Sequence, residues 1–295
     1  MTGFRDLGRR VYGWMFMPAP RSRVAVFRAI VYSFIFVDVF LTTSWIAGHG
    51  DLPTALYHPL WLGRILHLPA PTPVMVALVQ AALLLLAAVA AFGRAPRAAG
   101  AGVAVLYLLW LLIGFSYGKV DHDRVAFLVA LAVLPTVGRA GFHGGVSDEA
   151  AGWALRFVQI AVVLTYFLAA FAKLRFGGIE WLTGATLARA VIRRGTWLAT
   201  PLLEIPWALQ GLQFLIVLFE LSSPLLLVRG RIGRAVLAVA AGFHLVTYAS
   251  ITIIFLPHVV CLLTFLPLER VPEKIASMSA LLRRRVMPAG AGGDR

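Results

Sequence analysis

Residues 153–174 read WALRFVQIAVVLTYFLAAFAKL, an apolar stretch that closes on a lysine. A helix needs about 20 mainly apolar residues to cross the hydrocarbon core of a bilayer, so this stretch predicts a transmembrane helix. Similar stretches lie near residues 24–46, 74–93, 98–117, 124–139, 207–228, 234–253 and 255–268. We therefore expect an all-α fold, a polytopic integral membrane helix bundle of about eight transmembrane helices.

The composition indicates that the bilayer is the main solvent of this protein. Of 295 residues, 60% are hydrophobic and 14% are charged, and the mean hydropathy is +0.84. A soluble domain could not bury that much apolar surface. The net charge of +14 would suggest nucleic acid binding in a soluble chain, but here the cations lie in short segments between apolar stretches. Nucleic acid is therefore excluded as a partner, and the lipid bilayer is expected.

The cations also predict the orientation of the chain. Arginines are more numerous in the segments that lie on the same side as both termini, and by the positive-inside rule that side is cytoplasmic. We expect a multi-pass protein of the cell (inner) membrane, without a cleaved signal peptide. Its predicted parts are a basic N-terminal segment over 1–23, a transmembrane domain over 24–268 and a basic tail over 269–295 whose end is disordered.

Two outer segments, 47–73 and 181–197, are rich in tryptophan and apolar residues and predict short interfacial helices. In the second, Thr183 is placed to cap a helix in which Leu187 and Val191 share one face. The opposite face carries arginines that would meet lipid headgroups; these are Arg189, Arg193 and Arg194. Two interpretations stay open, a lid over an outer cavity and a passive surface helix.

Ionisable residues inside apolar spans are costly unless they are paired, so each one marks a candidate site. Arg28 and Asp38 lie about 15 Å apart along the first span, at 1.5 Å per residue, and cannot pair directly. Glu220 and His244 fall at similar depths on the sixth and seventh spans and are placed to hydrogen-bond. One interpretation is a structural polar network of Arg28, Glu220 and His244.

Lys173 and His122 are the candidate reactive residues. Only three of the 27 basic residues are lysines, and an ammonium, unlike a guanidinium, can lose its proton when it is desolvated. His122 lies in the segment 121–124, Asp-His-Asp-Arg, where a neighbouring carboxylate would favour the protonated ring, a donor to an oxyanion. The competing interpretations are a snorkelling anchor for Lys173 and a solvated helix-capping turn for 121–124.

Other named chemistries find no support in the sequence. The remaining histidines, His49, His58, His67, His143 and His258, show no metal-binding spacing, and no Walker loop, GxSxG elbow or CxxCH is present. The single cysteine, Cys261, lies in an apolar stretch, which indicates packing. No metal is expected.

Four segments in order along the chain carry a family resemblance. They are Ala25-Val-Phe-Arg28 with Asp38, Asp121-His122, Tyr166-Phe167 through Lys173-Leu174 with Trp181, and Gly242-Phe243-His244 with Phe255 and Val259. Together these segments resemble the membrane domain of vitamin K-dependent gamma-glutamyl carboxylase and of related bacterial proteins that carry the horizontally transferred transmembrane (HTTM) domain. The resemblance runs from about residue 24 to residue 268.

The resemblance implies that Lys173 is the general base that deprotonates a reduced quinone of the vitamin K kind. In the carboxylase, this step starts an oxygenation that generates a strong base for carboxylation by carbon dioxide, a lyase reaction. His122 would stabilise charge near the quinone oxygen. The substrate-binding candidates are Tyr166, Trp181 and Asp38, and the supporting polar residues are Arg28, Glu220 and His244.

The sequence departs from the carboxylase in one respect. It ends about where the carboxylase continues into a large lumenal domain that helps bind its protein substrate, so protein carboxylation does not follow from the resemblance. Whether the chain is an enzyme stays open. The alternative is a non-catalytic module that binds a lipid or a partner protein, for maturation, export or immunity of a secreted peptide, with Lys173 as a headgroup contact.

Overall fold

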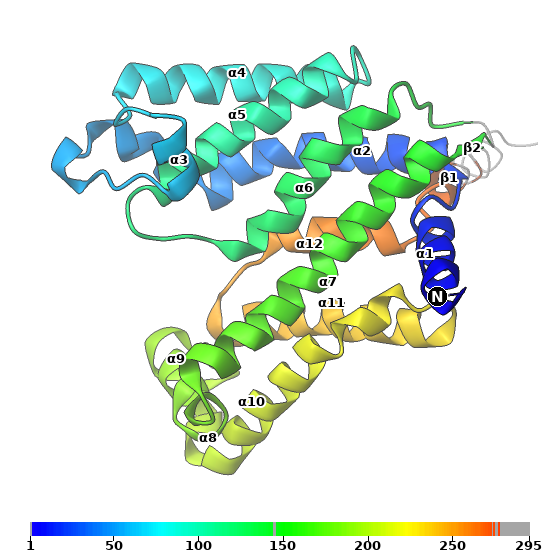
Figure 1. Cartoon of the computed structure of the whole chain (residues 1–295). Coiled ribbons are helices and arrows are strands. Elements are labelled where there is room, and N and C mark those ends of the chain that lie inside the picture. The colour runs from blue at the N-terminus through cyan, green and yellow to red at the C-terminus, as the bar shows by residue number, and fades with distance from the viewer. Residues whose placement is uncertain (1, 144–145, 273, 275–276, 278–295) are drawn as a thin grey trace, which may run out of the picture.

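The computed structural model describes residues 2–143, 146–272, 274 and 277 (Figure 1). It is nearly all-α, as the sequence predicts, with 77% of the chain helical. The two strands in the described residues are short, and β1 (Ala19–Pro20) pairs antiparallel with β2 (Ser147–Asp148). The end of the basic tail, which the sequence predicts to be disordered, lies outside the described residues.

The α-helices follow one another along the whole described chain. They are α1 (Thr2–Met15), α2 (Arg21–Val37), α3 (Trp61–Ile65), α4 (Pro73–Ala91), α5 (Ala98–Phe115), α6 (Val125–Val133), α7 (Glu149–Gly177), α8 (Glu180–Thr183), α9 (Thr186–Arg194), α10 (Pro206–Leu221), α11 (Arg231–Ile251) and α12 (Leu256–Leu262). Short helical turns join them. They are a π-helix at Asp38–Thr42 and 3₁₀ helices at Ser44–Asp51, Thr54–Leu56, His122–Arg124, Leu134–Val137, Thr200–Glu204, Ser223–Leu227 and Leu263–Phe265.

Five helical segments are long and apolar enough to cross a membrane: α2 with its π-helical continuation, α4, α5, α7 and α11. They fit a membrane-embedded protein. The predicted count of about eight is not confirmed, because the other three apolar stretches form shorter helices. Proline accounts for part of this, since Pro135 follows the nine-residue α6 and Pro257 opens α12. At 1.5 Å per residue, α6 spans about 14 Å, less than half of a hydrocarbon core.

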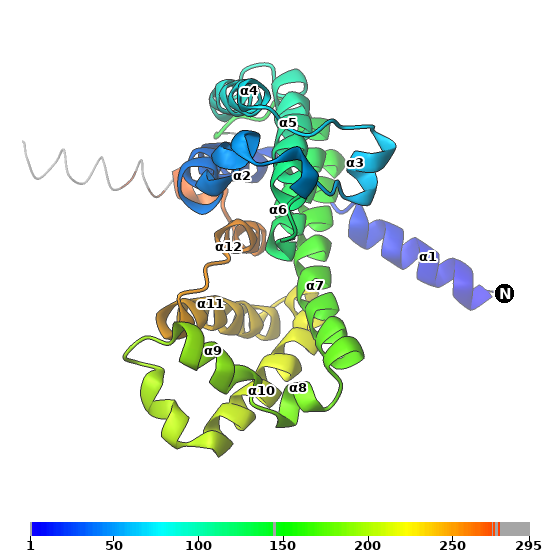
Figure 2. The same ribbon diagram turned by 90° about the vertical axis from the view of Figure 1, so that its left-hand side faces the viewer.

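The long helix α7 connects two groups of helices. Figures 1 and 2 show α2, α4, α5 and α6 on one side, α8 to α11 on the other, and α12 between them. Helix α7 packs against α6 in the first group and α10 in the second, and α12 contacts both α6 and α7. Asp148 caps its first turn by accepting a hydrogen bond from the Ala151 amide at 2.7 Å. At its other end, Gly178 adopts a positive φ of 61°, which lets the chain turn back toward α10.

The two groups differ in how densely they are packed. The first contains the large buried side chains of the core, among them Trp110, Tyr32, Tyr107, Phe27 and Phe127. In the second group α11 has only 11% of its apolar span buried within the protein. Its exposed apolar residues suit a surface that lipid covers. The loosely packed second group is therefore where a cavity can form.

Helices α8 and α9 occupy the segment for which the sequence predicts a short amphipathic helix. In α9, Val191 is buried and Leu187 is half-buried, while the three arginines of the helix are exposed. The predicted cap at Thr183 is wrong: α8 ends at this residue, and its hydroxyl donates to the carbonyl of Ile179. The side chain of Gln213 on α10 accepts the hydrogen bond from the Leu187 amide instead, at 2.8 Å.

Candidate functional site

A cavity of about 510 Å³ lies mostly in the second group of helices. It is lined by residues of α7 to α12 and of the 3₁₀ turn His122–Arg124. Most of the residues predicted from the sequence as site residues line it; they are His122, Tyr166, Lys173, Trp181, Glu220 and His244. Arg28 and Asp38 are not among its lining residues. The volume lies within the usual range of about 300–1,000 Å³ for small-molecule sites.

Lys173 and Glu220 form an ion pair on the wall of this cavity. The lysine Nζ lies 2.6 Å and 2.8 Å from the two carboxylate oxygens of Glu220. The side chain of Glu220 is 5% exposed and that of Lys173 is 23% exposed. The indole of Trp181 flanks the ammonium, with Nζ 5.4 Å from the ring centroid. Lys173 is therefore paired with a carboxylate, a partner that the sequence did not predict.

Helical spacing places the lysine and the tyrosine of the sequence motif on the same cavity. Tyr166 and Lys173 are two turns apart on α7, so their side chains project from one face of the helix. Between them along α7, Ala170 packs with Val217 of α10 and Leu182 of α8 in a small buried cluster. This packing brings Glu220, one turn further along α10, up to Lys173.

The other end of the polar lining is formed by Tyr166, His244 and His258. The Tyr166 hydroxyl lies 2.6 Å from His244 Nε2. The ring of His258 stands edge-on to Tyr166, with centroids 4.5 Å apart. The predicted contact between Glu220 and His244 is not formed in the described structure, because each has a different partner. Glu220 and His244 lie at similar depths on two helices, but whether they meet depends on the rotation of each helix about its axis, which depth does not give.

His122 reaches the cavity from the 3₁₀ turn before α6, in surroundings that disfavour its protonated form. Burial, followed by the positive charge of Lys173, lowers the pKa of His122 below its ordinary value of 6.5. Asp121 and Glu220 act in the opposite direction but do not outweigh these effects. The carboxylate of Asp121 also lies 3.0 Å from Lys119. The pKa of His122 is therefore shifted in the direction opposite to the one expected from neighbouring carboxylates.

A second cavity, of about 620 Å³, lies along α6 and α7. It shares four lining residues with the first cavity: His122, Thr165, Ala169 and Lys173. The rest of its lining is apolar; the residues are Val125, Val129, Phe157, Ile160, Ala161, Leu164, Leu168 and Ala172. Lys173 and His122 thus stand where an apolar space meets a partly polar one.

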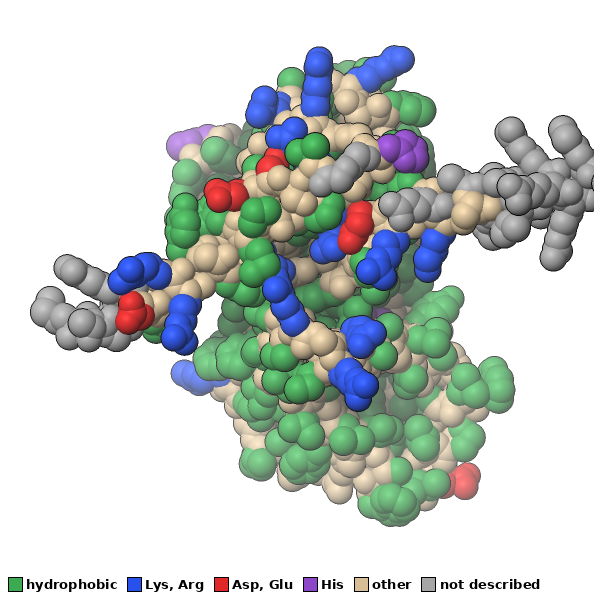
Figure 3. Space-filling view, turned by 90° about the vertical axis from the view of Figure 1, so that its right-hand side faces the viewer, with side chains coloured by type: hydrophobic (Ala, Val, Ile, Leu, Met, Phe, Trp, Pro, Cys, Tyr) green, Lys and Arg blue, Asp and Glu red, His purple; other side chains and the backbone are tan. Residues whose placement is uncertain are grey.

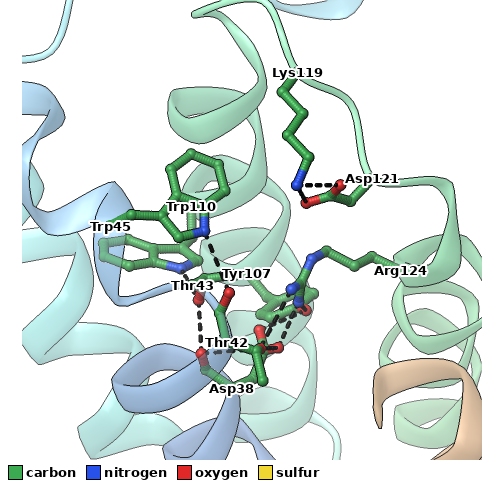
Figure 4. A network of polar contacts seen from close by, with 9 residues as sticks. All are labelled: Asp38, Thr42, Thr43, Trp45, Tyr107, Trp110, Lys119, Asp121 and Arg124. Carbon is green, nitrogen blue, oxygen red and sulfur yellow. Dashed lines mark hydrogen bonds and ion pairs between the residues drawn. The ribbon is translucent and has the colours of Figure 1, made fainter. Parts of the chain in front are cut away.

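Asp38, which is itself fully buried, belongs to a different polar cluster (Figure 4). Its carboxylate accepts hydrogen bonds from Arg124 and from the hydroxyls of Thr42 and Tyr107, the last at 2.9 Å. The predicted substrate contact of Asp38 is therefore not supported by its position. Arg124 follows His122 in the same short turn, so its ion pair with Asp38 holds that turn against α2 and α5. Asp38 positions His122 indirectly.

Arg28 is also separate from the cavity. Its guanidinium donates hydrogen bonds to the carbonyls of Leu134 and Gly138, at the end of the turn after α6. The predicted network of Arg28, Glu220 and His244 is therefore wrong. Arg28 satisfies carbonyls that have no helical partner because the regular helix ends in this turn.

Sequence reasoning missed two buried polar residues: His258, which lines the cavity, and Gln213, which supports the segment 181–187. His258, 2% exposed, was considered only as a metal ligand. Gln213, 1% exposed, donates to the carbonyls of Trp181 and Leu182 at 2.9 Å and 2.7 Å and so ties the segment over the cavity to α10. Each is a polar residue inside an apolar span, and that signal could have identified both.

Comparisons with known proteins gave no match: no family model, no curated protein and no solved structure is similar to this chain. Within the described residues, no group of three or more histidine, cysteine, aspartate or glutamate side chains could hold a metal ion. The functional argument therefore rests on the geometry of the cavity and on the resemblance of the four segments.

Proposed function

We propose that this chain is an integral membrane protein that binds a reduced quinone in the cavity of about 510 Å³ and removes a proton from the quinol. The observation that carries the proposal is the ion pair of Lys173 and Glu220 on the wall of a largely apolar cavity. A buried acid and base in contact can exchange a proton and act on a weakly acidic hydroxyl. An apolar cavity also suits a ligand drawn from the bilayer.

In this proposal the base is the pair rather than Lys173 alone. When the pair is charged, the carboxylate of Glu220 accepts the proton, and the ammonium of Lys173 stabilises the phenolate that forms. When the proton has moved within the pair, the neutral amine of Lys173 accepts it instead. Both routes give the same products, a phenolate beside a doubly protonated pair.

His122 and Trp181 complete the proposed site. The neutral imidazole of His122 has one N–H, which can donate to the developing phenolate oxygen. Trp181 offers a flat apolar face beside the ammonium, where a ring can stack. The resemblance adds a later step to the proposal, reaction of the phenolate with dioxygen as in a carboxylase.

We also propose that both termini lie on the cytoplasmic side of the inner membrane and that α6, α10 and α12 complete about eight crossings. The distribution of charge supports this orientation. Figure 3 shows lysine and arginine side chains gathered on the face that carries α1 and the β1–β2 pair. Arg21 and Arg23, at the start of α2, pair with Asp148 and Glu269 and draw the ends of the spans together there.

One observation favours a second candidate, a non-catalytic module that binds a lipid or a partner such as a secreted peptide. Lys173 is already neutralised by Glu220 at 2.6 Å, as a structural ion pair would be. In that case the pair holds α7 and α10 together, and the cavity simply accommodates a lipid chain.

Four variants in lipid nanodiscs, one of them a control, separate the candidates. Lys173→Ala and Glu220→Gln should each abolish turnover of a naphthohydroquinone, while Lys119→Ala, which alters an exposed lysine, should leave it unchanged. Lys173→Arg keeps the charge but cannot act as a base near neutral pH. Turnover that survives Lys173→Arg and Glu220→Gln would refute the catalytic proposal; a ligand bound without turnover would favour the binding module.

A further inference from the structure

His258 is a buried polar side chain without a partner. It is 2% exposed, and within the described structure neither of its ring nitrogens makes a hydrogen bond. His244 Nδ1 is also unpartnered, although Nε2 of the same ring contacts Tyr166. Buried polar groups in folded proteins are almost always hydrogen-bonded, so two such rings at one place require an explanation.

Both rings face a space that could supply the missing partner. His244 and His258 line the cavity of about 510 Å³, together with Tyr166 and the Lys173–Glu220 pair. A neutral imidazole carries one N–H donor and one acceptor nitrogen. The two histidines can therefore bind a hydroxyl or a carbonyl oxygen that enters the cavity.

The surroundings of the two histidines are aromatic. Phe219 lies edge-on to Tyr166 with centroids 5.0 Å apart, and Phe255 lies edge-on to His244 at 5.5 Å. The rings of His244 and His258 are 5.6 Å apart. A wall of ring edges and faces favours a flat aromatic ligand over a flexible polar one. Apart from Asp123, the Asp, Glu, Lys and Arg residues that line the cavity are Lys173 and Glu220, which pair with each other. The ligand group that contacts the two histidines is therefore uncharged.

We infer that His258 and His244 form a second oxygen-binding subsite, which takes an uncharged hydroxyl or carbonyl oxygen at the end of a flat ring opposite the Lys173–Glu220 pair. The inference rests on the proposed function, because it describes the same cavity, and it narrows the ligand class to rings with oxygen atoms on two opposite edges. A ring with a single oxygen satisfies only one end of the cavity.

The test compares two probes that differ in one oxygen, 1,4-dihydroxynaphthalene and 1-naphthol, with the full chain in nanodiscs. The wild type should bind the diol about tenfold more tightly, as one additional hydrogen bond predicts. His258→Phe keeps the ring packing but removes both nitrogens of His258, so it should lose most of the preference for the diol. His49→Phe is the matched control, because His49 is a buried histidine outside both cavities, and it should keep the preference.

The stability of the ligand-free protein gives an independent measurement. Because His258→Phe removes unpaired buried nitrogens, its melting temperature without ligand should equal or exceed that of the wild type. A clear loss of stability would mean that the nitrogens have partners within the protein, which would overturn the inference. Equal binding of the two probes by the wild type would overturn it whether or not the variant folds.

The outcomes also separate this inference from the proposed function. If Lys173→Ala leaves quinol turnover unchanged while His258→Phe removes the preference for the diol, the subsite stands and the proposed chemistry fails. If Lys173→Ala abolishes turnover while His258→Phe keeps the preference, the chemistry stands and the subsite fails. If the wild type binds neither probe, both are refuted.

Discussion

Replacing Lys173 by methionine removes one half of the buried ion pair and leaves the other half in place. The carboxylate of Glu220 is 5% exposed and would lose the group that lies 2.6 Å and 2.8 Å from its oxygens. Leaving one member of a buried pair without its partner costs about 3–5 kcal/mol. The reverse change, Glu220→Gln, leaves a lysine that is 23% exposed and can extend its ammonium toward water. We expect this change to cost only about 1–2 kcal/mol.

The assay is reversible unfolding in mixed micelles, followed by tryptophan fluorescence, for the wild type, both single variants and the double variant Lys173→Met/Glu220→Leu. The double variant should recover most of the loss, because apolar side chains can replace a buried pair at little cost. Lys119→Met serves as the control, since the side chain of Lys119 is 74% exposed. Equal costs for the two single variants, or costs below about 1 kcal/mol for both, would refute the buried-pair argument.

Three further predictions test other parts of the structure. An NMR titration of His122 should give a pKa below 6.5, because burial and a nearby cation disfavour the imidazolium; a higher value would contradict the placement of the ring. Asp38→Asn should destabilise the protein by about 3–5 kcal/mol, measured by the same unfolding assay, because Arg124 loses its buried counter-charge; an effect within error would exclude that pairing. Hydrogen bonds from Arg23 lower the pKa of Glu269 below its ordinary value of 4.5, so the pair stabilises the fold above that pH and its contribution disappears as pH falls through the lowered pKa. Arg23→Gln should therefore cost less than about 1 kcal/mol at pH 7, and this cost should disappear as the pH falls through the lowered pKa of Glu269; a cost that does not decrease in acid would refute the linkage.

Hydropathy predicted the helical fold well because the length of an apolar run is what determines whether a helix can cross a bilayer. It did not predict how short some of these helices are, and the reasons are local. Pro135 ends the regular helix that begins at Val125, and Pro257 opens a helix of only seven residues. A window average counts these prolines as nearly neutral residues, although each removes a backbone donor.

The sequence predicted most of the residues that line the cavity, but it did not predict which side chains contact each other. Lys173 and Tyr166 share a helix face because their spacing is two turns, and that can be read from the sequence. The partners of Glu220 and Asp38 depend on how each helix is rotated about its axis, and depth in the membrane carries no information about rotation. The sequence analysis considered His258 only as a metal ligand. The informative property was that His258 is a polar residue inside an apolar span.

The two cavities share Lys173 and His122, and this affects how the binding of a ligand must be measured. The second cavity is bordered by the exposed apolar side chains of Phe157, Leu164 and Leu168, which face lipid when the protein is in a membrane. A ligand that enters along this route is supplied by the bilayer and not by the aqueous phase. Its occupancy then follows its mole fraction among the lipids, so a binding curve plotted against total aqueous concentration should shift in proportion to the amount of lipid added.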